Sequence, residues 1–154
     1  MCFRAAKATF EEVVAEMIEL NPSLTREELM EDGEEDVEVD PEDASRVKGD
    51  VYWDGWGFGM GIEVLPESIG DLTVGGWLSL FDNNLATLPA SFGSLTVGGF
   101  LGLRHNNLAT LPASFGSLQV GGQVYLDGNP VAASGPHFDG LDLVLEEVKG
   151  SYYY

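Results

Sequence analysis

The chain has almost no cysteine and no long apolar run. Cys2 is the one cysteine among 154 residues, so no intrachain disulfide can form. No stretch reaches the roughly 18 consecutive apolar residues that a membrane-spanning helix needs, and the first residues lack the apolar segment of a secretory signal. These absences predict a cytoplasmic, intracellular protein with no membrane insertion.

Basic residues are scarce as well. The chain carries 7 Lys and Arg against 26 Asp and Glu, for a formal net charge of −19. Nucleic-acid binding needs Lys and Arg to displace phosphate counterions, so we expect no nucleic-acid partner, and the same charge disfavours an anionic membrane surface. A basic partner and a merely solvated acidic surface both stay open as explanations.

What the sequence does contain is an internal repeat. Residues 65–87 and 88–110 align without gaps and differ at only 7 of 23 positions. Leu-Pro opens three successive units, at 65, 88 and 111, and each unit carries the pattern LxLxxNxL or its valine variant. The two apolar residues of LxL share one face at a period of two, so each such segment is predicted to be a short strand with its aliphatic side chains inward.

Three units in register, 65–87, 88–110 and 111–133, resemble the leucine-rich repeat family. The resemblance implies an α/β solenoid with short parallel strands on the concave face and a helical N-terminal cap. It also implies that Asn83, Asn106 and Asn129 form a structural asparagine ladder, since each can bond backbone groups in the turn after a strand.

The opposite side of each unit has its own apolar positions. Ile69, Phe92 and Phe115 are expected to fill the convex half of the core, together with Leu72, Leu95 and Leu118. The family pattern has a leucine where this chain has Gly75, Gly98 and Gly121, each after a valine. We expect valine to supply the buried contact there and glycine to permit an unusual backbone turn.

The solenoid is predicted to span 47–149, with less regular units at both ends. In the degenerate unit 47–64, Val51 and Trp53 are expected to form a first strand, while a hairpin at residues 53–56 is the competing interpretation. The insert GWGFGMGIEV, residues 55–64, alternates glycine with apolar residues, which is a strand signal. In the terminal cap 134–149, Leu143 and Leu145 fit a last strand.

Residues 1–30 are predicted to form the helical cap. Phe10, Val13, Val14, Met17 and Ile18 lie on one face of a helix that Thr9 caps and Asn21-Pro22 ends, and Thr25 with Glu28 starts a second short helix. The cap is expected to cover the open first strand, with partner binding as the alternative role. Residues 31–46 are predicted to be an acidic linker, and their spacing does not match a calcium-binding loop.

No motif indicates an enzyme, a cofactor or a metal site. GWGFGMG lacks the spacing of a phosphate-binding loop. His105 neighbours Asp82 and Asp127, and a Ser/His/Asp arrangement with Ser79 can be imagined, but no nucleophile elbow accompanies it. We therefore expect no catalysis, and we interpret His105 as a solvated residue on a binding face.

The differences between the two closest units indicate where function lies. Four of the seven fall at 77/100, 79/102, 81/104 and 82/105, which are outward positions of the strands, so the scaffold is copied and the outer face is rewritten. Aromatic side chains beside an arginine are typical of protein interfaces. We predict a protein or peptide partner on this face, bound by Tyr52, Trp77, Phe81, Phe100, Arg104, His105, Tyr125 and Asp127.

Two alternatives to this binding role are open. Trp77 and Phe100 could simply stack across the strands or lie under the N-terminal helix. The chain could also be a structural scaffold segment, or a self-associating fragment of a larger repeat protein.

Overall fold

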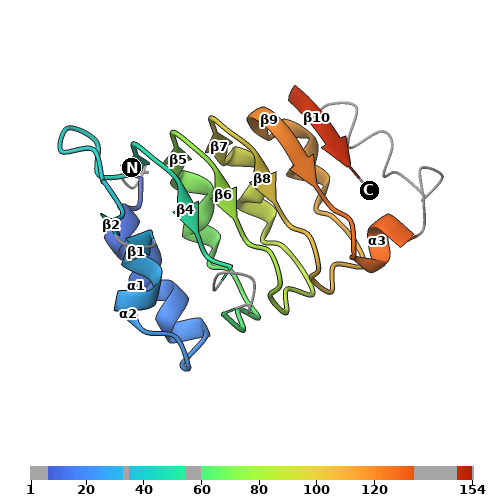
Figure 1. Ribbon diagram of the computed structural model, residues 1–154, viewed down its shortest axis with the longest axis horizontal. Helices are drawn as coiled ribbons and strands as arrows, with labels where there is room; N and C mark the ends of the chain where they lie inside the picture. The colour runs from blue at the N-terminus through green and yellow to red at the C-terminus, as the bar shows by residue number, and fades with distance from the viewer. Residues whose placement is uncertain (1–6, 33–34, 55–59, 134–148, 154) are drawn as a thin grey trace, which may run out of the picture.

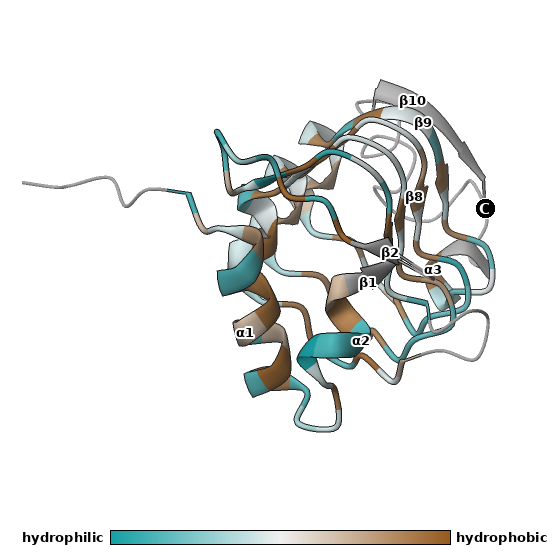
Figure 2. Cartoon of the chain, turned by 60° about the vertical axis from the view of Figure 1, so that its left-hand side comes forward, coloured by the Kyte–Doolittle hydropathy of each residue, from teal (hydrophilic) through white to brown (hydrophobic). Residues whose placement is uncertain are grey.

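The computed structural model describes residues 7–32, 35–54, 60–133 and 149–153. The repeating units lie side by side, and two short helices stand at the N-terminal end of the stack (Figure 1). Figure 2, seen closer to that end, shows α1 (Phe10–Leu20) and α2 (Arg26–Met30) in front of the units.

Each unit follows the same path through a 3₁₀ helix and two strand segments. The first unit runs through η2 (Glu67–Asp71), β5 (Thr73–Val74) and β6 (Leu78–Ser79), and the second through η3 (Ala90–Ser94), β7 (Thr96–Val97) and β8 (Leu101–Gly102). In the third, η4 (Ala113–Ser117) leads into β9 (Gln119–Tyr125), a single strand that spans both segments, and α3 (Pro130–Ala133) follows.

The strands other than β1 (Glu31–Asp32) and β2 (Glu35–Asp36) form one parallel sheet. Within the described residues it has eight strands, in the order β3-β5-β7-β9-β8-β6-β4, with β10 (Lys149–Tyr153) also paired to β9. β3 is Arg46–Val47 and β4 is Val51–Tyr52, and every pairing between its strands is parallel. The chain is thus an α/β-type arrangement on a parallel sheet, which confirms that part of the predicted fold class.

The sheet differs from the prediction in two places. LxL predicted one strand in each unit, whereas the Thr-Val segment before the glycines pairs with the neighbouring unit and adds a second. The strand expected at Leu143 and Leu145 lies outside the described residues, and β10 was not predicted. Residues 55–59 also lie outside, so neither the hairpin nor the strand suggested for that insert can be placed.

Aliphatic and aromatic side chains fill the interior of the units. The inward residues of LxL are all buried, at exposures of 0 or 1%. The convex positions are buried too, as predicted: they are Ile69, Leu72, Phe92, Leu95, Phe115 and Leu118. Phe92 and Phe115 stack with ring centroids 6.1 Å apart and planes 6° apart, so successive units align closely on this side.

Close backbone approach explains the Val-Gly-Gly triplets. A Cβ on Gly98 would overlap the carbonyl oxygen of Gly75, and one on Gly121 would overlap that of Gly98. The chain does bend at the glycine pairs of the first two units, but without left-handed backbone, since the described glycines with positive φ are Gly61 and Gly128. Glycine is required because the preceding unit occupies the side-chain position.

The same tight approach occurs at the 3₁₀ helices. A Cβ on Gly93 would overlap the backbone of Ser114, and the Ser114 hydroxyl donates to the Ala90 carbonyl at 2.5 Å. Successive units are therefore in backbone contact both at the 3₁₀ helices and at the glycine pairs.

The N-terminal helices cover the first coil. Thr9 Oγ1 accepts from the Glu12 amide at 3.1 Å, and Thr25 and Glu28 bond reciprocally, so both predicted helix starts are present. Trp53 stacks on Phe10 at 5.8 Å and donates its indole N–H to the Leu29 carbonyl at 2.9 Å. The apolar face of α1 is buried by this packing, which favours a covering role over partner binding.

Asn21 has a larger role than ending a helix. Its Oδ1 accepts from the amides of Glu63 and Val64 at 2.8 and 3.1 Å, and its Nδ2 donates to the carbonyls of Met17 and Val64 at 2.9 and 2.8 Å. This buried amide fastens the end of α1 to the chain before the first full unit.

The acidic segment is bonded to the sheet rather than being only a solvated linker. β1 (Glu31–Asp32) pairs with β2 (Glu35–Asp36), and Val39 bridges Val47. Charge alone suggested a linker, but the alternating Val37 and Val39 give the segment an apolar side, and Val37 is buried. Within it, the hydroxyl and amide of Ser45 donate to Asp43 and hold the pKa of that carboxyl below its ordinary value.

The glycine contacts predict a large cost for one added methyl group. We expect Gly98→Ala to lower the free energy of unfolding by about 2 kcal/mol or more, because the new Cβ forces two units apart. Gly49→Ala is the matched control, since nothing lies within 4 Å of its Cβ position. Urea unfolding of both variants measures the difference, and equal stabilities would contradict the close-approach explanation.

Candidate functional site

The outward side chains of the second strand segments form one surface. The register pairs Tyr52 with Ser79, Ser79 with Gly102 and Gly102 with Tyr125 across β4, β6, β8 and β9. Because residues paired across a parallel sheet lie side by side, the rewritten positions of the repeat meet on this surface.

Five rings make up what we call the aromatic face: Tyr52, Trp77, Phe81, Phe100 and Tyr125. Trp77 and Phe100 are closest, with ring centroids 4.6 Å apart, and Phe81 stacks on Phe100 at 5.9 Å. Tyr125 meets Phe100 edge-on at 5.5 Å, and Tyr52 meets Trp77 at 6.3 Å. Trp77 is 44% exposed, so the rings stack on one another and still present apolar area to solvent.

Two glycines, which have no side chain, leave room for the rings of Trp77 and Phe81. A Cβ on Gly99 would overlap the Trp77 indole, and one on Gly102 would overlap the Phe81 ring. Each ring therefore leans over a glycine of the next unit. The alignment of the two units identified the Ser79/Gly102 difference but not its cause, which is that glycine leaves room for the Phe81 ring.

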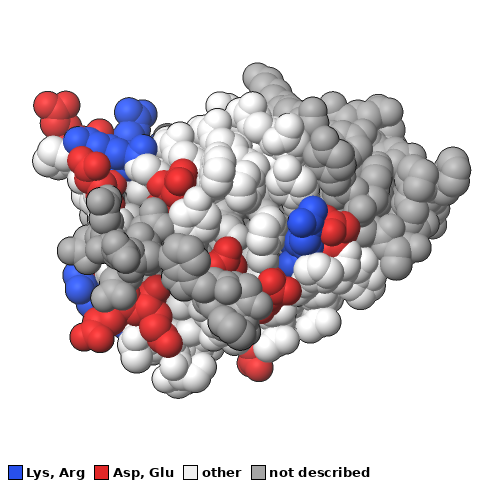
Figure 3. Space-filling model, in the orientation of Figure 1, with Lys and Arg blue, Asp and Glu red and all other residues white. Residues whose placement is uncertain are grey.

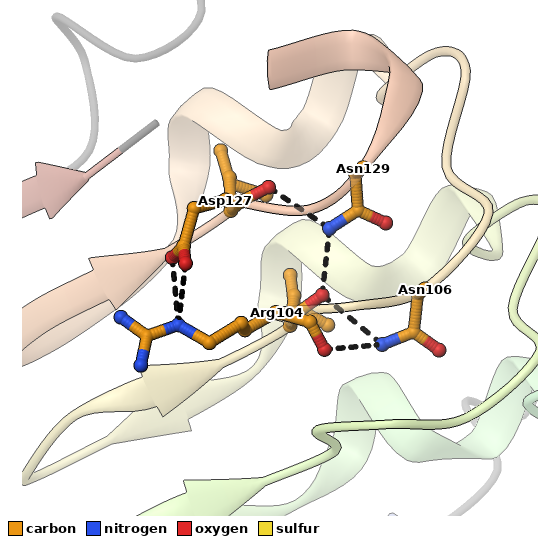
Figure 4. A network of polar contacts seen from close by, with 6 residues as sticks. Arg104, Asn106, Asp127 and Asn129 are labelled. Carbon is orange, nitrogen blue, oxygen red and sulfur yellow. Dashed lines mark hydrogen bonds and ion pairs between the residues drawn. The ribbon is translucent and has the colours of Figure 1, made fainter. Parts of the chain in front are cut away.

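Arg104 is held against the aromatic face by an ion pair and two rings. Its Nε lies 2.8 and 2.7 Å from Oδ1 and Oδ2 of Asp127 (Figure 4). Its guanidinium carbon is 5.4 Å from the centroid of Phe81 and 4.9 Å from that of Tyr125. The cation is thus partly neutralised and stacked at the same time.

Carboxylates surround the rings. Asp50 accepts from the Trp77 amide at 2.7 Å and from the Tyr52 hydroxyl at 3.3 Å, and Asp54 accepts from the Ser79 hydroxyl at 2.7 Å. With Asp82 and Asp127 they form what we call the acidic rim. Figure 3 shows this side of the molecule with uncharged surface over its upper middle, acidic and basic groups together at its left margin, further acidic groups toward the lower middle, and a basic group beside an acidic one to the right of centre.

His105 and Asp82 lie in left-handed backbone at equivalent places in two units. Both have φ of 56°, and Gly128, one unit further, has φ of 78°. A Cβ on Gly128 would overlap the His105 imidazole, so that ring leans on the next unit. The Ser79 hydroxyl donates to Asp54, so it is not paired with His105, and the imagined Ser/His/Asp arrangement is not assembled.

The three asparagines after the strands are buried and bond backbone groups. Nδ2 of Asn106 donates to the carbonyls of Leu80, Leu103 and Arg104 at 2.9, 3.0 and 3.3 Å, and its Oδ1 accepts from the Leu85 amide at 3.1 Å. Asn129 repeats this one unit on (Figure 4), and Asn83 donates to the Trp53 carbonyl at 2.8 Å. These side chains replace the ladder bonds that stop at the end of each strand.

Two further features bear on the classes of function. Among the residues that the structure describes, no group of three or more His, Cys, Asp or Glu is placed to hold a metal ion. In the same ranges no helix has the length and apolarity to cross a membrane.

No protein-family model matches this sequence, and comparison with curated proteins and with solved structures finds no match for it. The proposal of a function therefore rests on the surface of the chain itself.

The asparagines generate a stability prediction with a neighbouring control. Asn106→Ala removes one of two donors from each of three carbonyls and leaves the buried Leu85 amide without its partner, so we expect a loss of about 1–3 kcal/mol in the free energy of unfolding. Asn107 is exposed, and Asn107→Ala should change it by less than about 0.5 kcal/mol. Denaturant titration compares them, and a small loss for Asn106→Ala would be inconsistent with the bonding described.

The residues with positive φ lead to a prediction of increased stability. Asp82→Gly should raise the free energy of unfolding by up to about 1 kcal/mol, because glycine adopts positive φ without steric cost. The control Ala86→Gly, at an exposed position of ordinary φ, should lower it by about 0.4–1 kcal/mol. Thermal melts of the pair decide this, and a destabilised Asp82→Gly would refute it.

Proposed function

We propose that this chain is a leucine-rich repeat solenoid that binds a protein or peptide through the aromatic face. The observation that carries the proposal is the continuous cluster of five rings, with Trp77 44% exposed at one side of it. Contiguous exposed apolar area bordered by polar groups is typical of interaction sites. Tyr, Trp and Arg are also the residue types that dominate binding energy at interfaces.

The repeat supports the solenoid part of the proposal. The three 23-residue units share their strands, their 3₁₀ helix and their bonded asparagine, and each buries the apolar side chains of its neighbour. This is the one-dimensional stacking that repeat proteins use to build an extended binding surface.

The size of the face favours a short partner segment. Strands spaced about 4.8 Å apart, each with a few outward residues at about 3.3 Å, give a few hundred Å². A typical stable interface buries about 800 Å² on each partner. The aromatic face thus suits a peptide or a transient protein contact.

Ring stacking that only stabilises the sheet is the competing explanation, because cross-strand aromatic pairs contribute about 0.2–1 kcal/mol each. Under that explanation, removal of the rings lowers stability and leaves binding unchanged.

Truncation of the two closest rings tests the proposal. We expect Trp77→Ala with Phe100→Ala to remove the proteins that the immobilised chain captures, because the apolar centre of the face is lost. Leu20→Ala with Val64→Ala is the matched control, since both side chains are 45% exposed and neither belongs to the aromatic face.

Circular dichroism and thermal melts confirm that both double variants are folded. Capture that is unchanged by loss of the rings would overturn the binding role, and a mass that rises with concentration in light scattering would favour self-association instead.

A further inference from the structure

The aromatic face has an excess of negative charge. Asp50, Asp54, Asp82 and Asp127 stand against one guanidinium, that of Arg104, and Asp127 already pairs with it. The chain as a whole carries −19. A partner that covers these carboxylates with neutral or acidic groups would leave anions desolvated or repelled, so charge complementarity favours a cationic occupant.

Arg104 shows how this surface accommodates a cation. Its guanidinium lies over the rings of Phe81 and Tyr125, at 5.4 and 4.9 Å from their centroids, while a carboxylate of the next strand binds it from the side. An aromatic ring with a carboxylate on a neighbouring strand is therefore an arrangement that holds a cation on this sheet. The arrangement arises because the repeat position that holds Phe81 in the first unit holds Arg104 in the second.

Trp77 and Asp50 form a second such pair. The register places Asp50 beside Trp77 on the neighbouring strand, because Val51 pairs with Leu78. The Trp77 amide and the Tyr52 hydroxyl fix the Asp50 carboxylate at 2.7 and 3.3 Å, which uses two of its roughly four acceptor sites. Trp77 is 44% exposed, and tryptophan is the strongest cation–π acceptor among the side chains.

We propose that the partner is a cationic, extended peptide segment whose arginine stacks on Trp77 and bonds to Asp50. The inference rests on the proposed function and specifies the partner's chemistry. Arginine fits better than lysine, because a planar guanidinium can stack and donate to a carboxylate at once. A second copy of the chain is a poor occupant, since it would bring another acidic rim to this one.

The spacing sets the form of the segment. Three strand intervals separate the strand that follows Asp50 from the strand that precedes Asp127, about 14 Å across the sheet at about 4.8 Å each. An extended peptide at about 3.3 Å a residue crosses this in four or five residues, with alternate side chains facing the protein. An arginine on Trp77 followed two residues later by an aliphatic or aromatic side chain over Phe100 satisfies both the acidic rim and the rings.

Selection from a library of short random peptides tests the partner's chemistry separately from the existence of a binding site. The full chain is the bait, and the Trp77→Ala/Phe100→Ala variant is the counter-bait. We expect the enriched peptides to carry arginine. Enriched peptides without a cation would keep the proposed function and overturn this inference, whereas no enrichment over the counter-bait would overturn both.

Charge variants then locate the cation. For the best peptide, replacing arginine by the uncharged isostere citrulline should weaken binding about tenfold, and Asp50→Asn should have a similar effect. Asparagine keeps the acceptor oxygen for the Trp77 amide, so the fold is preserved. Glu19→Gln, on the exposed side of α1, is the control for the same change in net charge and should bind as the unmodified chain does.

Arg104→Gln provides the sharpest contrast. It removes the chain's own guanidinium from Asp127 and from the rings of Phe81 and Tyr125, so we expect the arginine peptide to bind more tightly to this variant. Weaker binding by Arg104→Gln, or equal binding by Asp50→Asn and Glu19→Gln, would overturn the inference.

Discussion

Backbone-to-backbone contact between successive units is the constraint on which this structure depends. The carbonyl of Gly75 occupies the place of a side chain on Gly98, and the relation repeats at Gly121. Only glycine tolerates such an approach. The contact fixes the distance from unit to unit, which in turn lets Asn106 reach the carbonyl of the preceding unit at 2.9 Å and lets the strands pair in register.

The same spacing shapes the outer surface. Rings one unit apart come within stacking distance, as Trp77 and Phe100 do at 4.6 Å, and the rings of Trp77 and Phe81 lean over Gly99 and Gly102 of the next unit. A small residue in one unit beside a large one in its neighbour thus lets the rings pack into one cluster instead of projecting separately. The positions that differ between the repeats are therefore coupled, because a change at one of them alters the packing of the ring beside it.

Much of this architecture could be predicted from the sequence, because a repeat of 23 residues shows its own periodicity. The inward leucines, the convex phenylalanines and the α1 helix with its Thr9 cap were all readable from spacing. The outward positions were also identified, although not how their side chains pack. Contacts such as those of Arg104 with Phe81 and Asp127 depend on rotamers that one chain's pattern does not encode.

The errors have a common physical origin. Charge density concealed the β-bridge between Val39 and Val47, and the close packing at the glycine pairs was not foreseen. Asn21 does end α1 as predicted, but its bonds to residues more than 40 positions away were not predicted. In each case the part that was missed is a long-range contact, which local preference does not encode.

The tight approach at Gly93, together with that at Gly98, has a consequence for any lengthening of the stack. Backbone contact at these two places of the coil fixes the interval between neighbouring units. An added unit could continue the stack at the same interval only with glycine at both positions.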